Sequence, residues 1–155
     1  MTIRNFPSVV ISTFFFIGYL PFVPGTFGSI AGLFLFYLIK NNILLQLGVT
    51  VLVIVLGFLT SGAAERFYAK KDVRFIVIDE VGGMLLSLLF LPQDLRFVIA
   101  AFLLFRLLDT FKPYPAYSLQ RIKGSAGVMM DDIVAGLYTN LILQVVWRFT
   151  SLSAS

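Results

Sequence analysis

The sequence contains no cysteine and no histidine among its 155 residues. Their absence excludes disulfides, thiolate nucleophiles, zinc sites with thiolate or imidazole ligands, and Ser-His-Asp triads. It also excludes phosphoryl transfer through phosphocysteine or phosphohistidine. The reactive side chains that remain are carboxylates, hydroxyls, lysines and arginines, and this set favours hard, oxygen-binding ions such as Mg²⁺.

Charged residues are also scarce, at 13% of the chain, whereas soluble domains carry about 25%. The hydrophobic fraction is 59% and the mean hydropathy is +0.94, which is typical of an integral membrane protein. The basic residues behind the net charge of +4 are too few and too scattered to form a continuous phosphate-binding stripe, so we expect no nucleic-acid partner. The length fits a single membrane-embedded domain over residues 1–155.

The apolar runs predict an all-α fold, an integral membrane helical bundle with about four to five membrane helices and an N-terminal interfacial helix. The interfacial or half-inserted helix occupies residues 1–23 and is broken by the prolines near its end. The predicted membrane helices cover residues 26–39, 43–60, 76–91, 97–108 and 133–149. The third and fourth are short for a full crossing, so they are either tilted or packed inside the bundle. Gly28 and Gly32 have the spacing of a close helix contact.

Basic residues concentrate in two loops, 65–74 and 112–123, which the positive-inside rule places in the cytoplasm. If successive helices cross the membrane in opposite directions, starting from these loops, four segments that are far apart in the sequence reach the same membrane face. They are the turn 24–29, the acidic pair in 78–80, the stretch 105–113 and the acidic pair 131–132. The pattern therefore predicts one site built from four parts of the chain.

Five of the eight acidic residues lie in these segments: Asp79, Glu80, Asp109, Asp131 and Asp132. So many carboxylates near lipid repel one another unless cations neutralise them, and Mg²⁺ does so while binding a substrate phosphate. Arg106, Asp109 and Lys112 follow one another at three-residue spacing, which predicts a metal ligand between two phosphate-binding cations. Thr26 and Ser29 are candidates for further phosphate contacts at a helix start.

Each feature also has a structural explanation. Asp131 or Asp132 can cap the last helix, where an acid interacts favourably with the helix dipole. Arg106 and Asp109 can form a simple intrahelical pair.

The remaining features have structural alternatives too. The acidic pair of 78–80 can mark a membrane boundary, and 24–29 can be an ordinary tight turn. Arg121 and Lys123 are expected to bind anionic headgroups rather than substrate.

A polar or small residue recurs every four positions along the last predicted helix. The members are Asp132, Gly136, Asn140, Gln144 and Arg148. Such a stripe normally faces neighbouring helices, where amides hydrogen-bond and glycine allows close approach. We therefore expect Asn140 and Gln144 to serve helix packing, with Asp132 pointing into the bundle.

Four blocks of the sequence carry a family resemblance, and together they span roughly residues 18–140. They are LPFVPGTFGSIAG (20–32), KDVRFIVIDEVGGM (71–84), FRLLDTFKPYP (105–115) and GSAGVMMDDIVAG (124–136). In this order they resemble the signature of the phosphatidylglycerophosphatase A family.

The resemblance implies a bacterial, multi-pass enzyme of the cytoplasmic (inner) membrane with its active site facing the cytoplasm. It would use Mg²⁺ to convert phosphatidylglycerophosphate to phosphatidylglycerol and inorganic phosphate. The implied catalytic and metal-binding residues are Asp79, Glu80, Asp109, Asp131 and Asp132, and the implied phosphate-binding residues are Arg106, Lys112, Thr26 and Ser29. Asp72 lies in a matching block and is a further candidate.

Two other functions remain open. One is a phosphatase acting on another lipid phosphate, and the other is a small cation-transporting membrane protein. A transport path predicts acids distributed through membrane depth, but the predicted helices 43–60 and 133–149 contain none. The pattern leaves open whether water or a carboxylate attacks the phosphorus, and it does not indicate an oligomeric state.

Overall fold

The computed structural model describes residues 6–71 and 73–153, and all regular structure within them is helical. The elements in chain order are α1 (Phe6–Ser12), the short 3₁₀ helix η2 (Ile17–Tyr19), α2 (Pro24–Ile39), α3 (Ile43–Tyr68), α4 (Ile78–Leu88), α5 (Leu95–Phe111), α6 (Ala116–Leu119) and α7 (Ser125–Ser153). The predicted all-α class is confirmed for this part of the chain.

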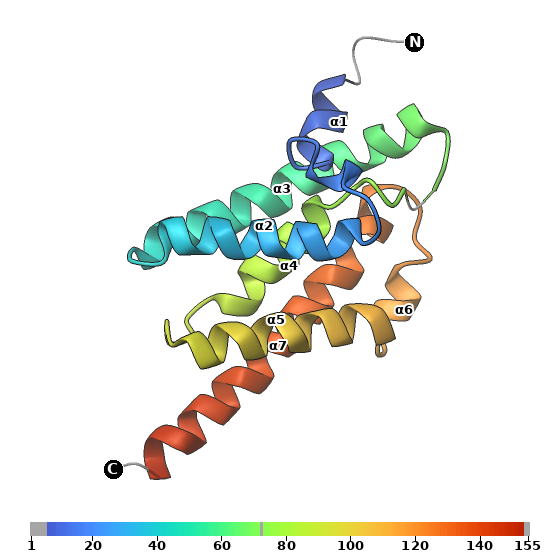
Figure 1. Ribbon diagram of the computed structural model, residues 1–155. Helices are drawn as coiled ribbons and strands as arrows, with labels where there is room; N and C mark the ends of the chain where they lie inside the picture. The colour runs from blue at the N-terminus through green and yellow to red at the C-terminus, as the bar shows by residue number, and fades with distance from the viewer. Residues whose placement is uncertain (1–5, 72, 154–155) are drawn as a thin grey trace.

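Helix α4 occupies the centre of the bundle and packs against α2, α3, α5 and α7. Figure 1 shows α2 and α3 on one side of it and α5 and α7 on the other. Its 11 residues rise only about 16 Å, roughly half the thickness of a bilayer core. Most of its side chains are buried. Of the two arrangements expected for residues 76–91, tilted in the membrane or packed inside the bundle, the structure therefore shows the packed one.

Glycines let α2 approach α4 closely, as their spacing predicted. A Cβ added at Gly28 would lie 2.9 Å from Val77 Cβ, and one added at Gly32 would lie 2.9 Å from Met84 Cβ. Real Cβ atoms are not found this close, so the helix contact depends on the missing side chains.

The Asn140 amide of α7 binds the C-terminal end of α4. Asn140 Nδ2 donates to the carbonyl oxygens of Ser87 (3.1 Å) and Leu89 (2.7 Å), and Gln144 Nε2 donates to Asn140 Oδ1 (2.7 Å). These bonds satisfy carbonyls left unpaired where α4 ends. The predicted packing role is confirmed for Asn140, and Gln144 contributes to it only by bonding Asn140 within α7.

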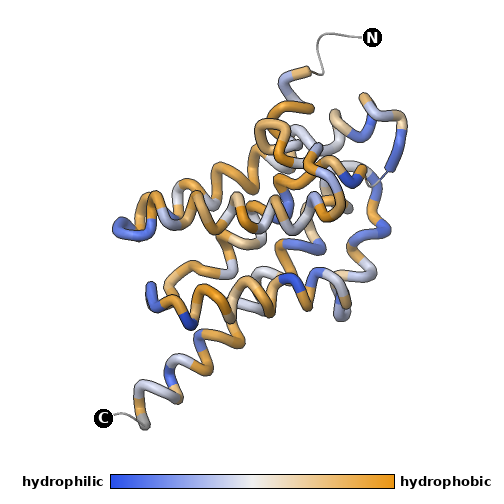
Figure 2. Tube along the Cα trace, in the orientation of Figure 1, coloured by the Kyte–Doolittle hydropathy of each residue, from blue (hydrophilic) through white to orange (hydrophobic). Residues whose placement is uncertain are grey.

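The outer surface of the bundle is strongly apolar. Helix α5 exposes a hydrophobic side chain at every fourth position, at Leu95, Ile99, Leu103, Leu107 and Phe111. Within the described residues, α3 and α7 are the two helices long and apolar enough to cross a membrane. Figure 2 shows hydrophilic residues gathered near the two ends of the bundle, with a mainly hydrophobic zone between them. Such a surface fits contact with lipid.

The N-terminal helix breaks earlier than predicted. Helix α1 ends at Ser12, and Phe14, Phe15 and Phe16 have positive φ angles of 46°, 54° and 69°. Thr13 Oγ1 accepts a hydrogen bond from the Phe16 backbone N–H and stabilises this turn. The chain thus turns before it reaches the prolines, whereas residues 1–5 of the predicted segment lie outside the described residues.

Helix α3 continues to Tyr68, so Glu65 and Arg66 lie on a helix rather than in the predicted loop. The segment Ala63–Arg66 consists of good helix formers, and no breaker follows until Ala69 adopts a left-handed φ of 51°.

Helix α7 begins at Ser125, about two turns before the predicted start. Gly124, with a φ of 74°, ends the preceding turn, and the small residues after it continue directly into the helix. Asp131 and Asp132 therefore lie in the second turn of α7. The alternative in which either residue is the helix N-cap is wrong.

Candidate active site

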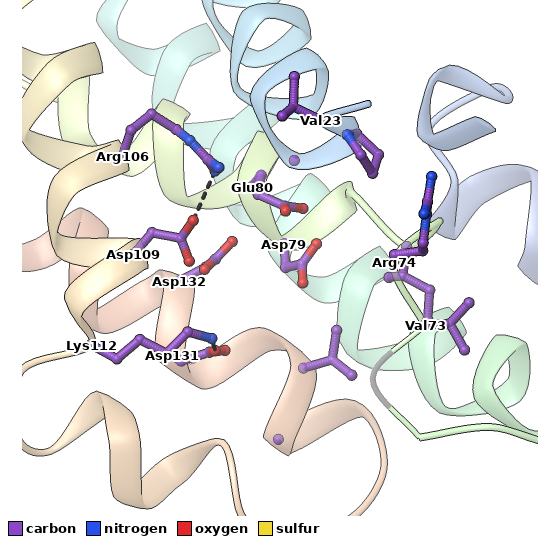
Figure 3. Close-up of a pocket in the computed structure, with 15 residues that line it drawn as sticks. Val23, Val73, Arg74, Asp79, Glu80, Arg106, Asp109, Lys112, Asp131 and Asp132 are labelled. Carbon is purple, nitrogen blue, oxygen red and sulfur yellow. Dashed lines mark hydrogen bonds and ion pairs between the residues drawn. The ribbon is translucent and has the colours of Figure 1, made fainter. Parts of the chain in front are cut away.

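One pocket of about 280 Å³ draws residues from all four segments that the sequence predicted to converge. Its lining comprises Val23, Pro24, Gly25, Val73, Arg74, Ile76, Asp79, Glu80, Arg106, Asp109, Lys112, Gly127, Val128, Asp131 and Asp132. Figure 3 shows the five acidic side chains pointing toward a common space, with cations around them. All five predicted acids and both predicted cations thus share one pocket.

Three carboxylates form a tight cluster at the centre of this pocket. Asp79 and Glu80 belong to the first turn of α4, and Asp132 projects from α7, the helix that packs against α4. One carboxylate oxygen from each lies within 4.8 Å of the other two. Negative charges at this spacing repel one another strongly unless a cation lies between them.

Several oxygens in the pocket are buried without a hydrogen-bond donor. Within the described residues, Asp79 Oδ1, Glu80 Oε2, Asp131 Oδ1 and Asp132 Oδ2 have no partner. Burying such atoms unpaired is costly, and a bound cation would satisfy them. Because every available ligand atom is oxygen, the residues fit a hard divalent cation.

Two ion pairs flank the cluster. Arg106 Nη1 donates to Asp109 Oδ2 at 2.8 Å, and Lys112 Nζ donates to Asp131 Oδ2. Arginine and lysine each carry further N–H donors, so both cations can also bind a phosphate. Burial lowers the pKa of Lys112, but its hydrogen bond to Asp131 and the nearby carboxylates raise it by more, so the ammonium stays charged.

The end of α5 positions these pairs. Arg106 and Asp109 are one turn apart on the same helical face, which brings their side chains together. Lys112 follows the last helical residue and adopts a left-handed φ of 45°, with its N–H bonded to Leu108 O. The chain turns there, so Lys112 reaches α7 by leaving the helix rather than by continuing the predicted helical face.

Helix α2 contributes backbone to the pocket. A Cβ at Gly25 would overlap Glu80 Oε1 and lie 3.3 Å from Arg106 Nη1, so a larger residue here would displace the Glu80 carboxylate. Thr26 and Ser29 are not among the lining residues. Ser29 is fully buried, and its Oγ donates to Gly25 O at 3.1 Å. A phosphate contact by Thr26 or Ser29 stays a prediction.

Sequence reasoning did not single out Arg74, which lines the pocket. In the sequence it is one member of the basic loop 65–74, although its position five residues before Asp79 is a usable signal. Asp72, a further sequence candidate, lies outside the described residues.

The bundle has an apolar outer surface, and its site combines clustered carboxylates with an arginine and a lysine. These features define a class: helical, membrane-associated proteins with an acidic group that could bind a metal ion beside cations that can bind a phosphate. Comparison with protein families narrows this class. The family model described as Phosphatidylglycerophosphatase A matches residues 10–147, and the chain belongs to that family.

Three curated relatives are similar over most of the chain. A Bacteroides thetaiotaomicron protein named "Putative phosphatidylinositol-3-phosphatase" is 37% identical over 150 residues, which is 91% of this chain and 94% of the relative. Proteins named Phosphatidylglycerophosphatase A are 36% identical in Escherichia coli (81% of this chain, 75% of the relative) and 31% identical in Haemophilus influenzae (77% and 76%). No solved structure matches significantly.

Proposed function

We propose that this protein removes the terminal phosphate of phosphatidylglycerophosphate and that the reaction requires Mg²⁺. The observation that carries the proposal is the cluster of Asp79, Glu80 and Asp132 beside two paired cations, in a chain of this family. The products are phosphatidylglycerol and inorganic phosphate. The relatives named Phosphatidylglycerophosphatase A support this choice of substrate.

The metal would be held by Asp79, Glu80 and Asp132, which each bring one oxygen to the cluster and each have a buried oxygen without a hydrogen-bond partner. Asp131 offers one further unpartnered oxygen. A bound Mg²⁺ supplies positive charge that polarises the phosphate ester and offsets the charge of the carboxylates.

Arg106 and Lys112 would orient the terminal phosphate through their remaining N–H donors. Asp109 and Asp131 hold these two cations in place before the substrate arrives, so little reorganisation is needed when charge builds on the phosphoryl oxygens. In the net reaction the oxygen of water joins phosphorus, the bond between phosphorus and the glycerol oxygen breaks, and that oxygen takes a proton.

The size of the pocket suits a lipid headgroup. Its volume of about 280 Å³ is below the roughly 300–1,000 Å³ of pockets that enclose drug-sized ligands. The acyl chains would remain outside, against the apolar surface of the bundle. A phosphatase embedded in the membrane can therefore reach the phosphate while the substrate lipid stays in the bilayer.

For the membrane arrangement, we propose a single domain over residues 1–155 that crosses the inner membrane four to five times, with α3 and α7 as the longest spans. Lys70 and Lys71 lie between α3 and α4, and Arg121 and Lys123 lie between α5 and α7. These basic connections favour the cytoplasm for the end of the bundle at which α4 and α7 begin.

Hydrolysis by the purified protein in detergent tests the proposal. With phosphatidylglycerophosphate as substrate, we expect phosphate release that follows Mg²⁺ concentration, stops with a chelator and returns when Mg²⁺ is restored. Undiminished release under chelation would contradict the metal requirement, and no release at any metal concentration would contradict the function.

A second candidate substrate is phosphatidylinositol 3-phosphate, because one relative bears the name of a phosphatase for this lipid. Both lipids carry a phosphate monoester on a headgroup joined through a phosphodiester. Comparing kcat/KM for the two lipids under the same conditions decides between them.

A further inference from the structure

Arg74 is a third cation on the wall of the pocket, at its exposed edge. Arg106 and Lys112 are each bound to a carboxylate, but no carboxylate of the described residues lies within ion-pair distance of Arg74. Its guanidinium therefore keeps its donors available for an anion that arrives from outside.

Aromatic packing holds Arg74 near the pocket. Its guanidinium carbon lies 5.5 Å from the centroid of the Phe75 ring, and that ring stacks on Tyr19 at 4.9 Å. A cation over an aromatic face is attracted to it without giving up its charge. The arrangement limits the loss of side-chain freedom when the guanidinium binds a ligand.

Arg74 and Arg106 lie on opposite sides of the carboxylate cluster. Figure 3 shows Asp79 and Glu80 between the two arginine side chains, with Arg74 on the side of the chain that leads into α4. A phosphate held by Arg106 and Lys112 would thus lie away from Arg74. The exposed arginine is placed for a second anionic group of the same ligand.

The proposed substrate class has such a group, because the headgroup is attached to the lipid by a phosphodiester. Five carboxylates line the pocket, and a second negative charge at its edge would be repelled unless a cation stands there. Arginine suits this position, since its planar fork matches two phosphate oxygens.

We propose that Arg74 forms a separate anion subsite that binds the phosphodiester while Arg106 and Lys112 bind the terminal phosphate beside the carboxylate cluster. The subsite selects lipids that carry two phosphates over lipids that carry only a monoester. This inference rests on the proposed function and adds a specificity-determining residue to it.

The test uses Arg74→Gln, Arg74→Lys and the control Lys70→Gln, which removes one charge from the same basic segment outside this pocket. For phosphatidylglycerophosphate, we expect Arg74→Gln to raise KM by roughly ten- to a hundredfold with a much smaller change in kcat, as for a lost charged hydrogen bond. Arg74→Lys should fall between the parent and Arg74→Gln, and Lys70→Gln should match the parent.

Inhibition by two lipids provides the second measurement. Phosphatidylglycerol keeps only the diester, and phosphatidic acid keeps only a monoester. We expect Arg74→Gln to weaken inhibition by phosphatidylglycerol as strongly as it raises KM, and to change inhibition by phosphatidic acid less than threefold, which is about 0.6 kcal/mol.

Equal weakening for both lipids would overturn the inference, because it would indicate general attraction to an anionic surface. A loss confined to kcat would also overturn it and place Arg74 at the reacting phosphate. If the parent hydrolyses the substrate and Arg74→Gln behaves like Lys70→Gln, only this inference fails. A parent that does not hydrolyse phosphatidylglycerophosphate would instead refute the proposed function.

Discussion

Among single residues, Asp132 has the most direct connection to the proposed chemistry. Only 3% of its surface is exposed, one oxygen belongs to the three-carboxylate cluster, and Oδ2 has no hydrogen-bond partner in the described part of the chain. An amide at this position would fill the same volume, but it would replace a negatively charged ligand with a weaker neutral one.

Asp132→Asn should therefore lower kcat by at least about a hundredfold. Even residues that only contact the ligands of a metal typically lower activity or metal affinity 10–100-fold when they are mutated. Metal binding gives an independent readout: Mg²⁺ should raise the Tm of the parent in detergent and leave that of the variant nearly unchanged. Phosphate release and thermal unfolding, each measured over a range of Mg²⁺ concentrations, check both expectations.

Asp94→Asn is the matched control for this substitution. Asp94 caps α5 by accepting a hydrogen bond from the Arg96 backbone N–H at 2.8 Å, and it does not line the candidate active-site pocket. Asparagine is an equally good N-cap residue, so activity should be retained. Equal loss of activity in both variants would show that the effect of Asp132→Asn is not specific to the site.

For whole elements, the contact between α4 and α7 determines where the two halves of the carboxylate cluster meet. Asp79 and Glu80 come from α4, and Asp132 comes from α7. The two backbones touch at Gly83 and Gly136, where a Cβ on Gly136 would lie 2.6 Å from Gly83 O. The position of the site thus depends on two glycines that take no part in the chemistry.

Gly136→Ala should push α7 away from α4 and destabilise the protein by about 1–3 kcal/mol, the usual cost of overpacking. Because the same displacement moves Asp132 relative to Asp79, activity should fall as well. Thermal unfolding in detergent and phosphate release at saturating Mg²⁺ measure the two effects.

Gly48→Ala provides the control within α3. A Cβ at Gly48 would have no atom within 4 Å, so alanine should be neutral or should stabilise the helix by up to about 1 kcal/mol. If Gly136→Ala proved as harmless as Gly48→Ala, the close approach of the two helices would not be required.

The whole molecule has two polar ends and an apolar middle (Figure 2), and the candidate site lies toward one of these ends. The turn between α2 and α3, around Asn41, lies at the other end (Figure 1). This separation makes the orientation in the membrane measurable, because the chain has no native cysteine to interfere with labelling.

Single cysteines at Lys123 and Asn41 test the orientation. In intact bacterial cells, a membrane-impermeant thiol reagent that has access to the periplasm should label Asn41→Cys and leave Lys123→Cys unlabelled. After the cells are opened, both positions should react, since both residues are exposed. The cysteine-free parent should remain unlabelled throughout, and the reverse pattern in intact cells would place the site on the other face.

Much of this protein could be predicted from local sequence patterns. Long apolar runs predicted the helices, glycine spacing predicted a close helix contact, and the amides of the last helix predicted packing against neighbouring helices, although the structure was needed to identify α4 as the partner in both contacts. The acids could be identified as candidates because a carboxylate in an apolar chain requires a compensating partner. Each of these inferences needs only the chemistry of residues close together along the chain.

Only the tertiary structure showed which acidic residues form the carboxylate cluster and which form ion pairs. It groups Asp79, Glu80 and Asp132, pairs the two remaining acids with Arg106 and Lys112, and places Arg74 on the same pocket. These groupings depend on distances between side chains that are tens of residues apart in sequence. Electrostatic interactions act through space, so the order of residues along the chain could nominate these side chains but could not assign their partners.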